Sequence, residues 1–447
     1  MLGYCSINHA IANLADLNTL RRSRLYLSLM SPTLSGFNDG LAIVILNHNG
    51  RRHLGPCLAA VLSLDGLPGA EAVVVADNGS ADGSLEFVRR AFPGVRVLAF
   101  ASNLGFAAGN NRAAEAVDAD RILFLNDDTR IAPDALAYLS ATLALGATCA
   151  GARLVSWDGR RLDFDGGGAA LTGHGHALGH GRPVPRGTEA TGPRETLFGS
   201  GAALLIDRAT FLAVGGFEPD YFAYYEDVDL GWRLWLAGHT VVHVPAAVVH
   251  HRHHGTAAHL PGGAAARLYE RNALATVAKN YADDHLARVL PAALALAACR
   301  AGAGIEVIDA LERIQAEGAA LPLPPAGWPG WPYLAHLGLD FDALAQARAR
   351  VQGLRCRPDS AVLPRLTHPY TPVPPTAAGE AALRSAVRHF DLEPVFGPFP
   401  SPGLPGWRAW GRRTARSVAA LRAGGPGGLL EEARSYVAWR RQRGRAR

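Results

Sequence analysis

Two adjacent carboxylates, Asp127 and Asp128, are the residues of this sequence best suited to hold a metal ion. They follow the apolar run Ile122–Leu125, from which Asn126 separates them. Four consecutive apolar residues between polar ones are typical of a strand buried on both faces of a parallel sheet. Adjacent carboxylates repel each other unless a cation lies between them, and hard divalent cations prefer oxygen ligands. Asn-Asp-Asp is also good turn chemistry, so a metal site and a strand-end turn both remain open.

Three more strands are predicted before this one, and each ends in polar residues. The strands are Leu41–Leu46, Ala72–Ala76 and Val95–Phe100, and the polar segments after them are 47–50, 77–80 and 103–111. Helices are predicted between the strands, over about 53–64, 82–91 and up to 117. This alternation indicates a doubly wound, mostly parallel α/β sheet. Because crossovers are right-handed, the polar segments should converge with Asp128 at one edge of the sheet. The GxGxxG fingerprint of dinucleotide-binding folds is absent.

Small residues and a cluster of aromatic residues mark the second half of the sequence. Gly199-Ser200-Gly201 precedes the apolar run Ala202–Ile206. Such small residues would let a ligand approach the backbone closely. Aromatic faces such as that of Tyr225, within the segment 221–225, could contact a ligand, and a buried aromatic cluster is equally typical of such a pattern.

Acidic residues open a helix predicted over Leu230–Ala237. Glu226 and Asp227 stand at its start, where the helix dipole alone favours acidic residues. Asp229 could pair with Arg233, four residues further on in the same helix.

Histidines gather after the last predicted strand, Val241–Val249. His250, His251 and two more histidines follow it, a pattern too crowded for a defined tetrahedral zinc site. A separate segment, residues 173–181, reads GHGHALGHG and predicts a flexible loop, for which a lid over the site is one interpretation.

Length and composition predict a soluble enzyme with one large domain plus a smaller one, or with two to three domains. The 447 residues are 49% hydrophobic and 19% charged, which is ordinary for a globular enzyme. The net charge of +5 favours anionic ligands or an acidic membrane face. The five cysteines are scattered and form no CxxC pair, which argues against a disulfide framework or a cysteine zinc site and favours the cytoplasm.

No stretch is long enough to span a bilayer. The best candidate, Val289–Cys299, is short and contains Pro291. Residues 1–39 lack the charge order of a signal peptide and are predicted to form a loosely ordered leader. We therefore expect a cytoplasmic protein with peripheral contact to the inner face of the cell membrane.

Five blocks, in this order and spacing, resemble family 2 glycosyltransferases with the GT-A fold. They read ILNHNG, VVVADNGSADGS, NLGFAAGNN, LFLNDDT and, over Leu197–Arg233, LFGSGAALLIDRATFLAVGGFEPDYFAYYEDVDLGWR. The rhamnosyltransferase-like branch, which builds bacterial surface polysaccharide, is the most similar. The resemblance covers about Leu41–Thr256 and, more weakly, Leu268–Tyr281. It implies a GT-A type fold with a helical, Pro-rich C-terminal extension.

On the donor side, the resemblance implies that Asp77 accepts a hydrogen bond from the nucleobase of the sugar donor. His48 stands where the family often has tyrosine beside the base. Asn126 departs from the first aspartate of the family's DxD element, so Asp128 becomes the ligand of Mg²⁺ or Mn²⁺ and Asp127 contacts the ribose or the metal. The other implied donor contacts come from Asn47, Asn49, Asn103, Gly105 and Asn111.

On the acceptor side, the resemblance implies that Asp227 is the catalytic base, with Glu226 as its neighbour. The base would take a proton from the acceptor hydroxyl that attacks the anomeric carbon, and direct displacement would invert the configuration there. His251 would complete the metal shell, with His250 as the alternative. Acceptor contacts are expected from Gly199, Ser200, Gly201 and Tyr225.

The predicted organisation is a leader over 1–39, a glycosyltransferase domain over 40–260, a helical extension over 261–320 and a Pro/Arg-rich helical region over 321–447. The domain comprises a nucleotide-sugar half, 40–130, and an acceptor half, 131–260. The chain ends in the basic sequence WRRQRGRAR, which suits anionic lipids. A nucleic-acid tail would look similar, but no nucleic-acid partner is expected.

The leading hypothesis is a metal-dependent, inverting glycosyltransferase. Its substrates would be a nucleotide-diphosphate sugar and a lipid-linked or nascent surface glycan. The alternatives are a sugar-phosphate nucleotidyltransferase, which needs a Gly-rich loop with a basic residue that ILNHNG does not provide, and a catalytically inactive sugar-nucleotide-binding protein.

Overall fold

The computed structural model describes residues 38–185, 192–252, 264–300, 337–372 and 377–400. The chain divides into two compact units. Of the described residues, the first unit comprises 38–169, 173–283 and 337–367, and the second comprises 170–172, 284–300, 368–372 and 377–400. The predicted leader up to residue 37 and the basic C-terminal segments after residue 400 lie outside the described residues.

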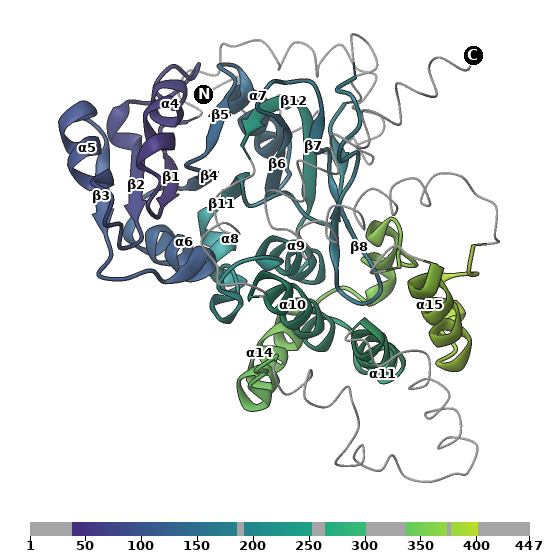
Figure 1. The fold of residues 1–447 in the computed structure, drawn as a ribbon. Helices are drawn as coiled ribbons and strands as arrows, with labels where there is room; N and C mark the ends of the chain where they lie inside the picture. Colours follow the sequence, from purple (N-terminus) through teal and green to yellow (C-terminus); the bar gives the residue numbers. More distant parts are fainter. Residues whose placement is uncertain (1–37, 186–191, 253–263, 301–336, 373–376, 401–447) are drawn as a thin grey trace, which may run out of the picture. The chain divides into compact units, whose positions relative to one another are not determined.

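The first unit is built on one large sheet (Figure 1). The strand order is β10-β12-β6-β11-β4-β1-β2-β3, with β5 paired to β12 and β7 paired to β6. The strands are β1 Leu41–Asn47, β2 Val73–Asp77, β3 Arg96–Ala99, β4 Arg121–Asn126, β5 Thr129–Ile131, β6 Cys149–Ser156, β7 Leu162–Phe164, β10 Arg194–Glu195, β11 Ala203–Asp207 and β12 Val241–His251.

The four strands predicted in the first half form the parallel part of this sheet. β1 runs parallel to β2 and β4, and β2 runs parallel to β3. The apolar residues of β1, β2 and β4 are almost all buried because helices cover both faces, whereas β3 is a partly exposed edge strand. The predicted α/β fold class is confirmed.

The second half of the sheet is mixed. β11 lies between β4 and β6 and is antiparallel to both, while β12 is parallel to β6. β8, Gly167–Ala169, and β9, Gly175–Ala177, form a separate antiparallel pair. The segment 173–181 is therefore not the flexible loop that its glycines predict: it contains β9, and His174 and His176 are buried.

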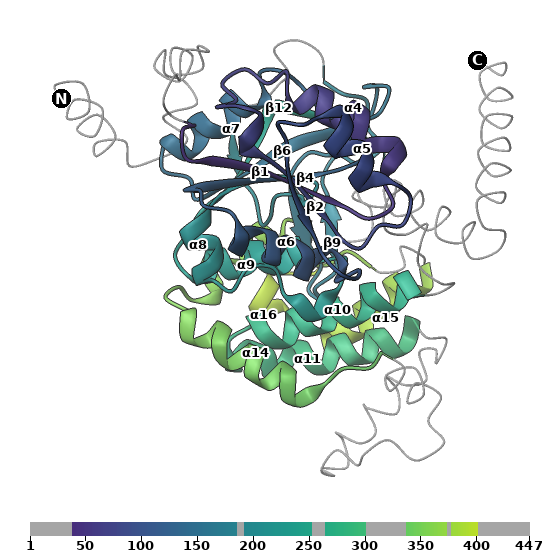
Figure 2. The ribbon, with the colours of Figure 1, turned by 90° about the vertical axis from the view of Figure 1, so that its left-hand side faces the viewer.

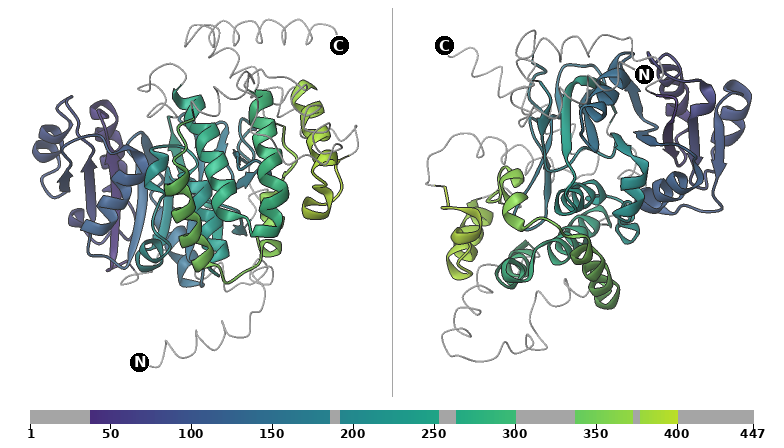
Figure 3. Two further views of the ribbon diagram at one scale, coloured as in Figure 1. Left: turned by 90° about the horizontal axis from the view of Figure 1, so that it is seen from below. Right: turned by 180° about the vertical axis from the view of Figure 1, so that it is seen from behind.

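Helices cover both faces of the large sheet. α4 and α7 lie on one face, and α6, α8 and α9 lie on the other (Figure 2). α10 packs against α9. α14 packs against α10, and α10 and α14 lie side by side (Figure 3). The helices of this unit are α4 Arg51–Val61, α5 Ser84–Ala91, α6 Gly105–Ala116, α7 Ala135–Ala144, α8 Arg208–Ala213, α9 Glu226–Leu236, α10 Ala264–Asn280 and α14 Phe341–Leu354, with short 3₁₀ turns at Ala70–Ala72, Pro219–Tyr221 (η3), Asp359–Ala361 and Leu363–Leu366.

Three buried phenylalanines join β4 to the segments that follow β11. The ring centroids of Phe124 and Phe211 are 5.0 Å apart, and that of Phe217 lies 5.3 Å from Phe124 and 5.2 Å from Phe211. Such tilted and edge-on pairs contribute about 0.5–1.5 kcal/mol each beyond their area of burial. This cluster fixes the turn at Phe217 against β4, the strand that precedes Asp127 and Asp128.

The second unit is helical. It contains α11, Asp283–Ala298, apart from its first residue, together with α15, Ala377–His389, and α16, Glu393–Phe396. Arg288 on α11 forms an exposed ion pair with Asp391, at 2.7 Å. No helix among the described residues is both long enough and apolar enough to cross a bilayer. The cysteines of the described residues form no disulfide.

Candidate active site

The register of the parallel strands brings their polar ends to one edge of the sheet. Asn47 at the end of β1 pairs with Asp77 at the end of β2, and Leu46 pairs with Asn126 at the end of β4. The ends of β1, β2 and β4 lie level to within one residue. This follows because the strands are parallel and each stops where its apolar run stops. The predicted convergence is therefore present in the structure.

Asp77 is buried and held by its neighbours. Asn47 donates from Nδ2 to Asp77 Oδ1 at 2.8 Å, and the Ser80 amide donates to Asp77 Oδ2 at 3.0 Å. Asn47 Nδ2 also donates to the Ser80 hydroxyl at 2.9 Å. Each carboxylate oxygen can accept more than one hydrogen bond, so Asp77 is oriented and still able to accept from a base.

The His48 ring is fixed by a hydrogen bond at each nitrogen. Nδ1 donates to the Asn78 carbonyl at 2.9 Å, and Asn49 Nδ2 donates to His48 Nε2 at 3.3 Å. Asn49 itself has φ 55°, a left-handed conformation that asparagine tolerates, and its Oδ1 accepts from the Ala81 amide at 2.8 Å. The half-buried ring is thus fixed beside Asp77.

The start of α6 is organised by two asparagines. Asn103 Oδ1 accepts from the Gly105 amide at 2.8 Å and from Asn78 Nδ2 at 3.0 Å. Gly105 has φ 82°, and a Cβ there would lie 2.5 Å from the Phe222 ring. Asn111, in contrast, exchanges two hydrogen bonds with the Phe217 backbone, at 2.7 and 2.8 Å, and so ties α6 to that turn.

The loop after β4 places Asp127 over Gly50. A Cβ on Gly50 would lie 1.8 Å from Asp127 Oδ2 and 2.6 Å from Asn47 Oδ1, an oxygen that is buried and has no hydrogen-bond partner among the described residues. Burial and the neighbouring Asp128 raise the pKa of Asp127 well above its usual value, against the opposite effect of His251. Asp127 Oδ2 and Asn47 Oδ1 therefore both lie next to Gly50, and the carboxylate of Asp128 is close to that of Asp127.

Asp128 is buried and faces His251 at the end of β12. Asp128 Oδ1 lies 3.3 Å from His251 Nε2, and His251 Nδ1 lies 2.8 Å from Asp163 Oδ2 on β7. Burial would lower the pKa of His251, but the flanking Asp128 and Asp163 raise it to about 9. A proton thus occupies the place between carboxylates that a cation could take.

His250 points elsewhere, because successive side chains of a strand face opposite sides. Its Nδ1 lies 3.3 Å from the Trp157 carbonyl, and its ring lies against Gly159. Of the two predicted histidines, the structure therefore brings His251 to Asp128. The backbone carbonyl of Asn126 accepts from the Thr129 hydroxyl at 2.6 Å and so helps to hold the turn that contains Asp127 and Asp128.

The segment Gly199–Gly201 lies between β6 and the start of α9. A Cβ on Gly199 would lie 2.9 Å from the Gly151 Cα on β6, so close packing of two backbones requires a small residue there. The Ser200 hydroxyl accepts from the Ala202 amide at 3.3 Å. The Gly201 amide donates to Asp227 Oδ2 at 3.1 Å, which links this segment to the acidic pair.

Asp227 stands in the first turn of α9 and accepts two backbone hydrogen bonds, from Gly201 and, at 2.8 Å, from Val228. Burial raises its pKa to about 6, although these two hydrogen bonds act in the opposite direction. Burial, followed by the charge of Asp227, raises the pKa of Glu226 well above its usual value. Burial thus disfavours the charged form of both carboxyl groups, and the charge of Asp227 adds to this effect at Glu226.

The loop before α9 is strained and held from two sides. Phe222, Tyr224 and Tyr225 have φ of 62°, 72° and 64°, a region that bulky residues rarely adopt. The Phe222 carbonyl accepts from the Phe106 amide of α6 at 2.6 Å. From α10, Asn272 Nδ2 donates to the carbonyls of residues 221, 223 and 224, at 3.1, 2.9 and 2.8 Å.

A buried ion network joins α9 to α10. Asp229 Oδ2 accepts from Arg233 Nε at 2.8 Å, as predicted, and Asp229 Oδ1 lies 3.1 Å from Lys279 Nζ. Lys279 also pairs with Glu218 at 2.6 Å, and Arg233 donates to the carbonyls of residues 214 and 216. Burial would raise the pKa of Asp229, but Lys279 and Arg233 lower it.

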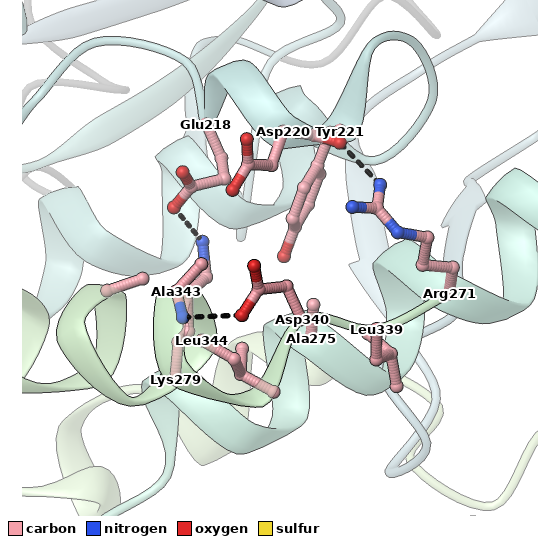
Figure 4. A pocket seen from close by; sticks show the side chains of 11 residues that line it. Glu218, Asp220, Tyr221, Arg271, Ala275, Lys279, Leu339, Asp340, Ala343 and Leu344 are labelled. Carbon is pink, nitrogen blue, oxygen red and sulfur yellow. Dashed lines mark hydrogen bonds and ion pairs between the residues drawn. The ribbon is translucent and has the colours of Figure 1, made fainter. Parts of the chain in front are cut away.

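A pocket lies next to this network, between η3, α10 and α14 (Figure 4). The Lys279–Glu218 pair lines it, and Arg271 donates to the Asp220 carbonyl beside it. The side chain of Asp340 accepts from the Ala343 amide and so caps α14. The charged side chains of Lys279 and Arg271 in this pocket therefore connect α10 to the segment around η3. None of the residues at the strand ends lines the pocket.

Three residues with close contacts to the predicted site were missed in the sequence. Asp163 and Asn272 lie far from the motifs that they contact, and Lys279 is the partner of a residue in the acidic helix. The weak similarity over Leu268–Tyr281 was the available signal for Asn272 and Lys279. Nothing in the sequence around Asp163 signals its position.

Comparison with known proteins gives the family of this chain. The family described as glycosyltransferase-like family 2 matches residues 39–272. N-acetylglucosaminyl-diphospho-decaprenol L-rhamnosyltransferase of Mycobacterium tuberculosis is 32% identical over 247 residues, which cover 49% of this chain and 78% of that protein. Rhamnosyltransferase WbbL of Escherichia coli is 37% identical over 70 residues, 14% of this chain and 26% of that one.

Among solved structures, GalNAc-T7 with UDP, GalNAc and Mn²⁺ superposes with a TM-score of 0.45 at 18% identity, over 57% of this chain and 51% of that one. The family match covers the parallel sheet, the acidic loop after β4 and the helix that carries Asp227. It favours sugar transfer over nucleotidyl transfer. The chain belongs to the family 2 glycosyltransferases and is similar to the rhamnosyltransferases among them.

Proposed function

We propose that this glycosyltransferase is metal-dependent and inverting, and that it moves a sugar from a nucleotide-diphosphate donor to a lipid-linked or nascent surface glycan. The observation that carries the proposal is the position of Asp227. It is a buried carboxylate at the start of α9, oriented by the Gly201 and Val228 amides. The same unit contains the Asp128–His251 pair that would hold the metal.

The residues after β4 fit a hard divalent cation. Asp128 and His251 would be its ligands, with Asp127 and Asn47 Oδ1 beside them. The Asn47 oxygen has no hydrogen-bond partner among the described residues, and burial together with Asp128 raises the pKa of Asp127, so a cation would stabilise both acceptor groups. When bound, Mg²⁺ or Mn²⁺ would neutralise the donor diphosphate and stabilise the leaving group.

The donor's base would lie at the ends of β1 and β2. Asp77, already oriented by Asn47 and Ser80, would accept from the base, and the fixed His48 ring would lie beside it. The start of α6, shaped by Asn103 and Gly105, would supply amide donors for ribose or phosphate.

Asp227 would accept the proton of the acceptor hydroxyl while that oxygen attacks the anomeric carbon. A base is most effective when its pKa lies near the working pH, and burial moves Asp227 in that direction. Burial and the neighbouring Asp227 raise the pKa of Glu226, which favours a single negative charge on this pair. A single displacement of this kind inverts the anomeric configuration.

The names of the relatives support a particular pair of substrates. The mycobacterial relative is named for rhamnose transfer to N-acetylglucosaminyl-diphospho-decaprenol. We infer a deoxyhexose donor of this kind and a polyprenyl-diphosphate-linked acceptor, which would be reached by peripheral contact of the protein with the cytoplasmic face of the membrane.

The test is transfer from labelled donors. The full chain would be incubated with Mn²⁺ and labelled dTDP-rhamnose, UDP-sugars or GDP-sugars, together with N-acetylglucosaminyl-diphospho-polyprenol. We expect labelled lipid with an inverted linkage from one of these donors, and loss of product with EDTA. If no donor is consumed, the proposed substrates are wrong, and if EDTA leaves the rate unchanged, metal dependence is wrong.

Gly50→Ala is expected to lower the transfer rate while the protein stays folded. The new Cβ would lie 1.8 Å from Asp127 Oδ2, so that carboxylate must turn away, and a displacement of about 1 Å near the chemistry costs about 100-fold in rate. Gly50 has φ −96°, which alanine adopts without strain. The measurement is the transfer rate together with the melting temperature.

Gly353→Ala on α14 is the matched control, because a Cβ there meets nothing within 4 Å. It should leave the rate unchanged. A Gly50→Ala protein with wild-type activity would show that the position of Asp127 does not matter for transfer.

A further inference from the structure

We propose that Asp163 is a positioning residue that holds His251 in the orientation needed to bind the metal. The inference rests on the proposed function, because His251 is a metal ligand only in that proposal. The carboxylate of Asp163 comes from β7, and Oδ2 lies 2.8 Å from His251 Nδ1. Both side chains are nearly buried, at 12% and 10% exposure, so water competes little for this contact.

The two nitrogens of the His251 ring face two different carboxylates. Nδ1 is bound by Asp163, and this leaves Nε2 directed at Asp128 Oδ1, 3.3 Å away. Two ligand atoms that each lie about 2.1 Å from one octahedral ion are about 3 Å apart. The observed pair is therefore already close to the spacing of two ligands in one shell, and Asp163 is the contact that keeps the ring there.

The pleat of β7 fixes the direction of Asp163. Its neighbours Leu162 and Phe164 are each 4% exposed and point into the core, so Asp163 points to the opposite face. β7 pairs with β6, and β6 pairs with β12, which carries His251. The carboxylate is thus supported by the sheet rather than by a flexible loop.

A second contact holds Asp163 from its other side. His180, which follows β9, has Nδ1 3.0 Å from the Asp163 carbonyl and 3.3 Å from Oδ1. The order of contacts is therefore His180, Asp163, His251 and Asp128. These contacts connect the segment 173–181, which the sequence suggested as a lid, to the proposed metal ligand His251. The connection is made by the side chain of Asp163 and requires no movement of the segment.

The chemistry of this arrangement is that of a histidine ligand with a carboxylate behind it. A carboxylate that accepts from Nδ1–H fixes the tautomer, keeps the lone pair on Nε2 and increases its basicity toward a metal. Removal of such a partner typically weakens metal binding about 10–100-fold. Asp165, two residues on, has a different environment, because Arg153, Arg194 and His243 surround its carboxylate.

The experiment measures binding of Mn²⁺ alone to the full-length protein, by the electron paramagnetic resonance signal of free Mn²⁺. The variants are Asp163→Asn, Asp163→Ala and His251→Ala, with Asp158→Asn as the control. Asp158 lies in the exposed turn between β6 and β7, where its contacts are with Ser156 and Arg160 of the same turn. We expect the dissociation constant to rise about 10–100-fold for Asp163→Ala, less for the nearly isosteric Asp163→Asn, and not at all for the control.

If Asp163 only stabilised the fold, the result would differ from that of a positioning role. Melting temperatures and the visible absorption of bound Co²⁺ distinguish the two roles. A positioning role changes the Co²⁺ spectrum of Asp163→Asn at an unchanged melting temperature. A lower melting temperature with wild-type Mn²⁺ affinity and spectrum overturns the inference. If His251→Ala weakens binding and both Asp163 variants do not, only this inference fails. If His251→Ala binds like wild type, or wild type takes up no Mn²⁺, the proposed metal site fails with it.

Discussion

Asp227→Asn is expected to reduce the transfer rate about 100–10,000-fold, the range that general-base catalysis contributes. The amide keeps the shape of the carboxylate but only one of the two oxygens that accept from the Gly201 and Val228 amides, and it cannot take a proton from the acceptor hydroxyl. Because Asp227 lies on α9 and the predicted donor residues lie at the ends of β1 and β2, we expect donor affinity to stay near the wild-type value. The measurement is kcat for transfer, with KM for the donor alongside it.

Asp220→Asn is the control for this variant. Asp220 is exposed and lies in η3, six residues before Glu226, so its change removes one negative charge from the same region without touching the base. A control that loses as much activity as Asp227→Asn would point to the net charge of the region. An Asp227→Asn protein with wild-type kcat would remove Asp227 from the mechanism.

The same residue predicts an acid limit for activity. Burial raises the pKa of Asp227 to about 6, and only the ionised carboxylate can accept the proton. The rate should therefore be half-maximal near pH 6 and fall about tenfold per unit below it, whereas an aspartate with the ordinary pKa would keep its activity to about pH 4. A pH profile of kcat between pH 4.5 and 8 checks this, and a flat profile down to pH 4.5 would contradict it.

Arg233→Met is expected to lower the free energy of unfolding by about 3–5 kcal/mol, the cost of removing one partner from a buried ion pair. The guanidinium is 4% exposed and binds Asp229 and two backbone carbonyls. Methionine fills similar space but leaves both carbonyls without this donor and Asp229 with only Lys279 as a cationic partner among the contacts seen here. Urea unfolding followed by tryptophan fluorescence is suitable, because Trp232 and Trp235 are buried on the same helix.

Arg350→Met supplies the comparison for that measurement. Arg350 is exposed on α14, so the same chemical change there should alter the free energy of unfolding by less than about 0.5 kcal/mol. Equal losses in the two variants would mean that the buried network contributes nothing beyond a surface arginine.

The sequence predicted the parallel half of the fold because that half repeats one local pattern. Apolar runs such as Ile122–Leu125 end abruptly in polar residues, and the parallel ladder then aligns their ends. The Asp229–Arg233 pair was also predictable, since four residues on a helix bring two side chains together. In each case a short stretch of chain contains all the information.

The remaining features depend on contacts that no local pattern encodes. The antiparallel direction of β11 and the pairing of β6 with β12 are set by packing between distant segments. His250 and His251 are equivalent by type, and only the pleat of β12 decides which one meets Asp128. The glycines of 173–181 suggested mobility, whereas the structure uses that small-residue segment for close packing, with Gly173 against the Ala273 backbone.

The buried position of Lys279 has a practical consequence for chemical labelling. It is the single lysine of the sequence, and its amine is 1% exposed between two carboxylates. An amine-directed reagent can therefore modify this lysine only when its ion pairs with Glu218 and Asp229 open. The rate at which such a reagent modifies Lys279 reports how often this buried ion network opens, in the same way that amide exchange reports local unfolding.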